Sequence, residues 1–173
     1  MPFPLSPEKL LKTLNKYSVE FIVIGLFGAG IHGYTIRTGD IDICPAPDLD
    51  NLEKLALALE ELEGRAVDPT ILILDAYTLE HAGILQVFTK YGKLDISPKP
   101  SGTQGYGELV ERAKTFSIWD TTVNVAAFED IILTKITADR PKDRAALPGM
   151  RKFISRQIEA EKEKKNLEGE EIE

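Results

Sequence analysis

The most constraining feature of this 173-residue sequence is a short apolar run at 21–24, Phe-Ile-Val-Ile, which ends at Gly25. A continuous run of β-branched and aromatic residues is typical of a strand that is buried on both faces. Such a strand needs other strands beside it and helices over both of its faces. The run therefore predicts a chain that is built around a central sheet.

Helical and strand-like patterns follow one another on both sides of this run. We expect helices at 6–18, 26–33, 48–62, 108–114, 128–138 and beyond Pro141. We expect further strands at 40–44, 71–74, 84–88, 94–96 and 121–125, with a hairpin turn at 89–93 and an exposed loop at 98–107. This order predicts a mixed α/β (α+β) fold, in which helices flank the sheet and the C-terminal end is helical.

Charge is concentrated at the C-terminal end of the chain. The formal net charge is −7, and residues 157–173 contribute −4 of it through seven Glu and three Lys. A Glu/Lys-rich end usually forms a solvated or frayed helix. We therefore expect a single domain over 1–156 and a charged tail over 157–173, which adds solubility or docks a basic partner.

Composition excludes several classes of protein. Cys44 is the only cysteine, so an internal disulfide and a multi-cysteine zinc or iron–sulfur site are excluded. No apolar run reaches the ~20 residues that cross a bilayer, and residues 1–4 lack the pattern of a secretory signal. We expect a cytoplasmic protein with no membrane partner. The acidic balance also argues against a broad DNA-binding surface.

Three aspartates are the strongest candidates for chemistry. Asp40 and Asp42 are separated by one residue on an expected strand, so both side chains lie on one face while Ile41 points the other way. Two adjacent carboxylates are costly unless a cation or protons compensate them. Asp95 lies between apolar neighbours on another expected strand. Together the three could form a Mg²⁺ or Mn²⁺ site for phosphoryl transfer; the alternative is an exposed Asp pair on an edge strand.

Four glycines follow the apolar run and open the expected helix at 26–33. They are Gly25, Gly28, Gly30 and Gly33. At this place they serve either phosphate binding or close packing of the helix on the strand. The spacing G-x-x-G-x-G does not fit the dinucleotide-binding pattern G-x-G-x-x-G, and Asp42 follows too soon for that pattern.

Residues 23–43 together resemble the signature of the DNA polymerase β nucleotidyltransferase superfamily: a strand, a Gly-Gly or Gly-Ser turn, a short helix, and D-x-D on the next strand. The part at 32–40 is similar to small bacterial and archaeal nucleotidyltransferases that include abortive-infection-type toxins. Residues 94–102 resemble the family's third-carboxylate strand, and residues 125–143 resemble its helical end. The resemblance implies the nucleotidyltransferase fold.

The resemblance also implies roles for individual residues. Asp40, Asp42 and Asp95 would hold the metal, and Asp95 would help to activate the attacking hydroxyl. Lys135 would neutralise phosphate charge or organise the site. The residues expected at the nucleotide are Gly25, Leu26, Gly28, Arg37, Thr38, Arg140 and Lys142.

Some of these residues have another possible role, and one of them departs from the family pattern. Arg37, Arg140 and Lys142 are equally explained as surface charge, with Asp143 as a partner for one of the bases. His32 is explained as a helix-end residue. Leu26 stands where the family has Gly or Ser, and its side chain could crowd the phosphates; the alternative is that Gly28 restores their access.

The function implied by the resemblance is metal-dependent transfer of a nucleoside monophosphate from an NTP to a hydroxyl. The acceptor would be RNA such as tRNA, a protein or a small molecule. A role as the toxin of a toxin–antitoxin system, with an antitoxin as partner, is implied as well. The alternative is a protein with this fold that has lost turnover and acts by binding or regulation.

Overall fold

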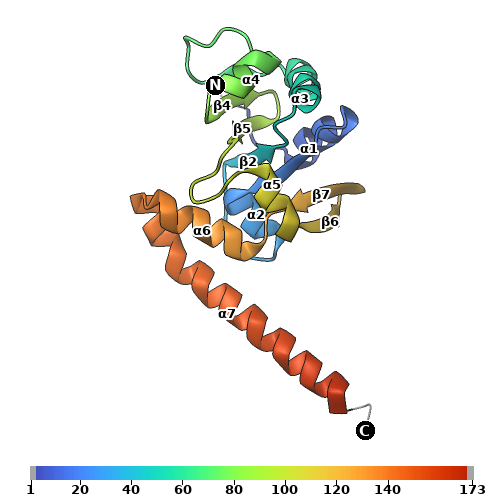
Figure 1. Ribbon diagram of the computed structural model, residues 1–173, viewed down its shortest axis with the longest axis vertical. Helices are drawn as coiled ribbons and strands as arrows, with labels where there is room; N and C mark the ends of the chain where they lie inside the picture. Colours follow the sequence, from blue (N-terminus) through green and yellow to red (C-terminus); the bar gives the residue numbers. More distant parts are fainter. Residues whose placement is uncertain (1–2, 171–173) are drawn as a thin grey trace.

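The computed structural model describes residues 3–170, which form a mixed sheet with helices around it (Figure 1). The helices are α1 (Pro7–Lys16), α2 (Gly25–Ile31), α3 (Leu49–Glu61), α4 (Ala76–His81), α5 (Tyr106–Arg112), α6 (Phe128–Ala138) and α7 (Pro141–Glu170). The strands are β1 (Phe21–Ile24), β2 (Asp40–Pro45), β3 (Arg65–Ala66), β4 (Leu85–Thr89), β5 (Gly92–Ile96), β6 (Lys114–Ile118) and β7 (Thr121–Val125). The expected mixed α/β fold is therefore confirmed.

The seven strands form one sheet in the order β3-β4-β5-β2-β1-β7-β6. β1 runs antiparallel to β2 and parallel to β7, and β2 runs parallel to β5. The strands at the two ends, β3–β4 and β6–β7, pair as antiparallel hairpin-like units. All four residues of β1 are buried, as expected for a strand near the centre of the sheet.

Helices cover the two faces of the sheet unequally. α1 and α3 pack against each other, and the C-terminal end of α3 lies over Val87 of β4. α2 packs on β1, β2 and α6. Along β4 and β5 buried residues alternate with more exposed ones, so only one face of this part of the sheet is covered. The other face, next to α2 and α6, is open.

The hydrophobic core is continuous from α1 through the sheet to the first turns of α7. Leu10, Ile41 and Leu94 are fully buried in it, and Met150 joins it from α7. Burial of such side chains contributes ~1.5–3 kcal/mol each.

α7 leaves the body of the molecule as a single long helix (Figure 1). Its first half is anchored by Phe153, whose ring packs on Phe128 and Tyr34 with centroid distances of 4.9 and 5.6 Å. Gly149 makes room for the Tyr34 hydroxyl, which a Cβ there would meet at 2.7 Å. From residue 155 to residue 169 every residue is exposed. The expected charged tail is thus helical as far as Glu170, and residues 171–173 lie outside the described part.

One expected strand is wrong. Residues 71–74 do not join the sheet; the last ladder bond before them is donated by Val67 N–H to the carbonyl of Gln86. Asp68 then forms a local turn, accepting hydrogen bonds from Thr70, and Pro69 has no N–H to donate. The chain turns away from the sheet edge and leaves Leu72 and Ile73 exposed.

Three short elements are absent from the sequence-based prediction. α4 begins where Asp75 accepts a hydrogen bond from Thr78 N–H. The sequence predicted a helix at 108–114. In the structure α5 ends at Arg112, and Lys114 begins β6, which pairs with β7. Trp119 and Asp120, both with positive φ, form the tight turn between these strands. β3 has only two residues and was not anticipated.

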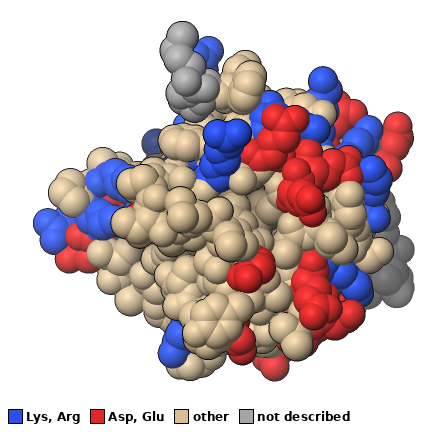
Figure 2. Space-filling model, turned by 90° about the horizontal axis from the view of Figure 1, so that it is seen from above, with Lys and Arg blue, Asp and Glu red and all other residues tan. Residues whose placement is uncertain are grey.

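An open groove of about 720 Å³ lies between α3 and the segment at 72–77. Its apolar side chains include Leu57, Leu72, Ile73 and Tyr77, which are all exposed. Figure 2 views the molecule from this end and shows acidic side chains gathered on one side of a wide uncharged area. Among residues 3–170 there is no helix whose length and apolar content would let it span a bilayer.

Candidate active site

The site is built on the pairing of β2 with β5. In this parallel pair Asp42 is the register partner of Asp95, and Asp40 is the partner of Lys93. Register partners on neighbouring strands point to the same face of a sheet. Three carboxylates and one ammonium group therefore lie side by side on the face that the helices leave open.

The opposite face of the same strands explains why this register is fixed. Ile41 and Leu94 are register partners and are fully buried. A slip by one residue would place these apolar side chains in the open site and the carboxylates in the core. The hydrophobic core thus holds the aspartates in place.

A cavity of about 440 Å³ opens over this face. The aspartates form one wall, and α6 with the start of α7 forms the other. The polar and charged residues that line it are Thr38, Asp40, Asp42, Gln86, Lys93, Asp95, Ser97, Ser101, Thr134, Lys135, Arg140 and Lys142. A cavity of this size lies within the range of small-molecule sites.

Asp42 carries the strongest electrostatic perturbation. Burial raises the pKa of Asp42 from 3.8 to about 7, and the charges of Asp40 and Asp95 act in the same direction, while Lys135 and Lys142 oppose the shift. Gly25 has a φ of +67°, and a Cβ at this position would overlap the Asp42 carboxylate. The turn between β1 and α2 therefore needs glycine, both for its backbone and for the space it leaves to Asp42.

Asp95 contains a buried oxygen with no hydrogen bond. Its Oδ1 atom has no partner of suitable geometry among the described residues. Its Oδ2 atom accepts long hydrogen bonds from Gln86 at 3.4 Å and from Lys93 at 3.5 Å. A buried carboxylate oxygen without a hydrogen bond is costly; the Lys93 ammonium group, 3.3 Å from this Oδ1, forms an ion pair with it but no hydrogen bond.

The opposite wall contains a buried ionic cluster. Asp143 is fully buried and lies 3.4 Å from Lys135 Nζ and 2.6 Å from Arg140 Nε. Burial opposes ionisation of Asp143, but the hydrogen bonds from Arg140 and the charges of Lys135 and Arg140 outweigh it and lower the pKa. The expected pairing of Asp143 with a base is confirmed. The cluster fixes Lys135 and Arg140 at the rim of the cavity.

We found no match to this chain among protein-family profiles or among curated proteins. Solved structures do match its fold. The lincosamide antibiotic adenylyltransferase LnuA, in a lincomycin-bound structure, is 15% identical with a TM-score of 0.56, over 86% of this chain and 98% of that one. ANT(2'')-Ia, in complex with adenylyl-2''-tobramycin, is 16% identical with a TM-score of 0.54, over 88% of this chain and 90% of that one.

A third structure, TM1012 from Thermotoga maritima, matches as well. It is 14% identical with a TM-score of 0.55, over 89% of this chain and 97% of that one. The chain has the nucleotidyltransferase fold. The expected fold is therefore confirmed, whereas none of these three matches represents the abortive-infection toxin type.

The nucleotidyltransferase fold implies a divalent cation, and the donor set can be tested against it. Asp40, Asp42 and Asp95 supply the hard oxygen ligands that Mg²⁺ and Mn²⁺ prefer. The raised pKa of Asp42 shows that its negative charge is poorly compensated, and Oδ1 of Asp95 accepts no hydrogen bond from residues 3–170. As the side chains stand, however, residues 3–170 contain no group of three His, Cys, Asp or Glu residues arranged to hold a metal ion. The ligand chemistry fits, but the three carboxylates do not converge on one point.

Most of the other residues expected at the nucleotide do lie at the cavity. Gly25, Leu26, Thr38, Arg140 and Lys142 line it. The hydroxyl of Thr38 lies 3.2 Å from Asp40 Oδ1, to which it donates a hydrogen bond. Leu26 is half-buried, so part of its side chain faces the cavity.

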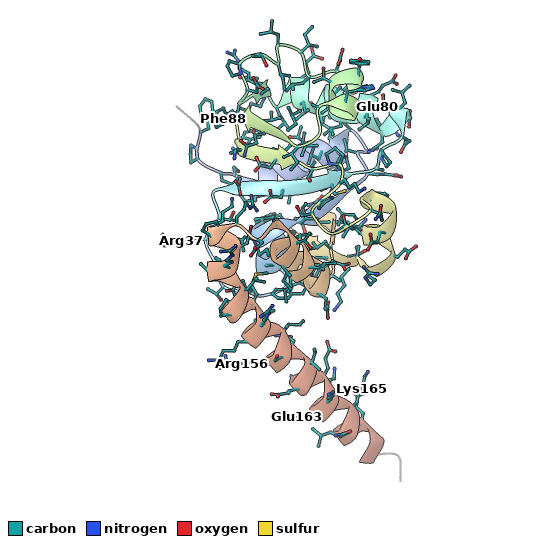
Figure 3. All side chains as sticks on the ribbon, turned by 60° about the vertical axis from the view of Figure 1, so that its left-hand side comes forward. Arg37, Glu80, Phe88, Arg156, Glu163 and Lys165 are labelled. Atoms are coloured by element: carbon teal, nitrogen blue, oxygen red, sulfur yellow. The ribbon has the colours of Figure 1, made fainter. Side chains whose placement is uncertain are left out.

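Two expected residues do not line the cavity. Gly28 is buried where α2 meets α6 and β7, and a Cβ there would press on Ile131 and Val125, so it serves close helix packing. Arg37 is exposed on the outside of the molecule, near the start of α7 (Figure 3). For these two residues the nucleotide-binding prediction is not supported.

Several cavity residues were missed. Lys93, Gln86, Ser97, Ser101 and Thr134 all line the cavity. Lys93 could have been found, because it lies two residues before Asp95 on an extended segment and so shares its face.

Two other polar groups near the site are structural. The ring of His32 lies 2.8 Å from the Ala126 carbonyl and packs edge-on against Phe116 and Phe128, which confirms it as a helix-end residue. Burial raises the pKa of Cys44 to about 12, so its thiol is unreactive.

Proposed function

We propose that this chain transfers a nucleoside monophosphate from an NTP to a hydroxyl acceptor. The observation that carries the proposal is the register of β2 and β5, which aligns Asp42 with Asp95 and leaves Asp40 on the same face of the cavity. Basic residues on the other wall, including Lys135, Arg140 and Lys142, suit a triphosphate between the two walls.

Asp40, Asp42 and Asp95 would hold the divalent cation. When bound, the cation would balance charge on the triphosphate and on the leaving group. The chain itself would do the positioning, on which this chemistry mostly depends. Lys142 and Arg140 would bind the outer phosphates, with Lys135 held behind them by Asp143.

The acceptor oxygen would attack the α-phosphorus, and the bond from that phosphorus to the bridging oxygen would break, which releases pyrophosphate. The proton of the acceptor hydroxyl must leave during this step. Oδ1 of Asp95 accepts no hydrogen bond from any of residues 3–170, so it can accept one from the acceptor hydroxyl, and Asp95 would take the proton.

Three acceptor classes are compatible with the proposal: a small molecule, RNA such as tRNA, and a protein. A small molecule is favoured by the cavity volume of about 440 Å³ and by the antibiotic ligands of the similar structures. A toxin role, with an antitoxin as partner, remains a proposal that growth measurements can test.

The test is label transfer from each of the four α-labelled NTPs, with Mg²⁺ or Mn²⁺. Separate reactions contain lincomycin, tobramycin, purified tRNA or protein extract as acceptor. We expect label on one acceptor class, lost in Asp42→Ala and in Asp40→Ala but kept in the matched control Asp50→Ala, whose aspartate is exposed on α3. Slowed growth on expression, relieved by Asp40→Ala, would support the toxin role.

A second candidate function is that of a binding or regulatory protein, which has this fold but no nucleotidyl transfer. It is favoured by Leu26, whose side chain lies at the cavity where phosphate must approach. Calorimetry separates the two. If no NTP binds in a metal-dependent way to the wild type or to Leu26→Gly, the enzyme proposal fails and the binding function remains.

A further inference from the structure

Lys93 places a positive charge inside the carboxylate cluster. Its Nζ atom lies 3.3 Å from Asp95 Oδ1 and 3.7 Å from Asp40 Oδ2. Only a quarter of its side chain is exposed. Among residues 3–170 no other basic side chain forms an ion pair with either of these carboxylates.

This position follows from the sheet and is not a chance surface contact. Lys93 is the register partner of Asp40 and lies two residues before Asp95 on the same strand. Both neighbours point to the face that Lys93 points to. The ammonium group therefore has a carboxylate beside it across the strand pair and another along its own strand.

The Lys93 ammonium group would compete with a divalent cation for the same carboxylates. Asp40 and Asp95 would help to hold such a cation, and Lys93 Nζ is within 4 Å of an oxygen of each. Two cations that share these carboxylates would repel each other.

We propose that Lys93 is a stand-in cation, which neutralises Asp40 and Asp95 before the metal enters and is displaced when the metal enters with a triphosphate. The inference rests on the proposed function, because it takes the ligand to be a metal-bound NTP. The displaced ammonium group would find a new partner in the phosphate oxygens. Free metal would have no such partner to offer, so the site would bind metal and nucleotide together.

The proposal makes Lys93 a positioning residue with two measurable effects. A unit charge at this distance changes the affinity of a carboxylate for a proton by about ten- to a thousandfold, and a metal ion responds to the same charge. Lys93→Met should therefore bind free Mn²⁺ at least about tenfold more tightly than the wild type. Lys93→Arg keeps the charge and should behave like the wild type.

The second effect is the coupling between metal and nucleotide. In the wild type, α,β-methylene analogues of ATP, GTP, CTP or UTP should raise the affinity for Mn²⁺. In Lys93→Met this rise should shrink or vanish, because the competing charge is gone from the start. Electron paramagnetic resonance of free Mn²⁺ measures both quantities on the full chain without any turnover.

The matched control is Lys90→Met. Lys90 precedes the same strand but pairs at 3.9 Å with Glu63, away from the cavity. It should leave Mn²⁺ affinity and coupling unchanged. If Lys93→Met does not fold, Lys93→Gln is measured in its place, and the Mn²⁺-dependent rise in melting temperature should be larger for it than for the wild type.

The outcomes separate the two proposals. If Lys93→Met binds free Mn²⁺ no more tightly than the wild type, while both bind the Mn²⁺–analogue complex, the stand-in role of Lys93 is refuted and the proposed function stands. If neither protein binds Mn²⁺ with or without any analogue, both proposals fail.

Discussion

Removal of the Asp42 charge should stabilise the protein when no metal is bound. The pKa of Asp42 is raised from 3.8 to about 7 in the folded chain. Below pH 3.8 Asp42 is protonated in the folded and in the unfolded chain, so it does not change the free energy of unfolding. Between pH 3.8 and pH 7 the unfolded chain loses this proton more easily than the folded chain, so the free energy of unfolding falls as pH rises. Each pH interval of one corresponds to ~1.4 kcal/mol, so the full cost is about 4 kcal/mol above pH 7. This is a large share of the ~5–15 kcal/mol that stabilises a domain.

The neutral variant Asp42→Asn lacks this cost at every pH. At ~1.4 kcal/mol for each pH unit above 3.8, the charge of Asp42 lowers the free energy of unfolding of the wild type by about 2 kcal/mol at pH 5 and by about 4 kcal/mol at pH 8. The stability difference in favour of Asp42→Asn should therefore grow by about 2–3 kcal/mol between pH 5 and pH 8. Its direction follows from burial and from the neighbouring charges of Asp40 and Asp95.

The assay is urea unfolding in EDTA at pH 5 and pH 8, followed by circular dichroism. Asp50→Asn is the control, because Asp50 is exposed on α3, and it should not show this pH-dependent gain. Parallel pH dependences for the wild type and Asp42→Asn would refute the reasoning, since they would mean that Asp42 ionises as easily in the folded chain as in the unfolded one.

Two further predictions concern the walls of the cavity. Gly25→Ala should destabilise the chain by at least about 1–2 kcal/mol, because of the positive φ and the overlap with Asp42, whereas Gly30→Ala, with open space around its Cβ, should be neutral or stabilising in thermal melts. Asp143→Ala should cost about 3–5 kcal/mol in urea unfolding, because it leaves Lys135 buried without its partner. A Lys135→Met/Asp143→Ala double variant should recover part of that loss, and a strictly additive result would argue against the pair.

The carboxylate face could be predicted from the sequence because it depends on period-two alternation alone. Asp40 and Asp42 share a face wherever the strand lies. Their alignment with Asp95 could not, because it depends on the parallel register of β2 with β5. Asp95 was predicted as the third carboxylate from its place between apolar neighbours on another expected strand, and the resemblance implied the same role. Lys93 was overlooked because residues 89–93 were assigned to a hairpin turn, whereas Lys93 lies in β5 and is paired with Asp40.

The sequence-based secondary-structure predictions were wrong at two places for local reasons. The apolar run at 71–74 has the composition of a strand, yet the Asp68 turn and Pro69 direct it away from the sheet edge. β6 was hidden because its residues alternate weakly and lie at the opposite edge, where no face is fully buried. In both cases a tertiary position at the edge of the sheet outweighs the local pattern.

α7 combines two very different local stabilities in one continuous helix. Its first half is tied to the body through Phe153 and Met150, whereas residues 155–169 are surrounded by solvent. An isolated helix of about 12–15 residues is only marginally stable in water. Amide protons beyond residue 156 should therefore exchange orders of magnitude faster than those near Met150, and a protease should shorten the chain from this end while the folded body survives. The helix is continuous along the chain, but we expect it to melt in two stages.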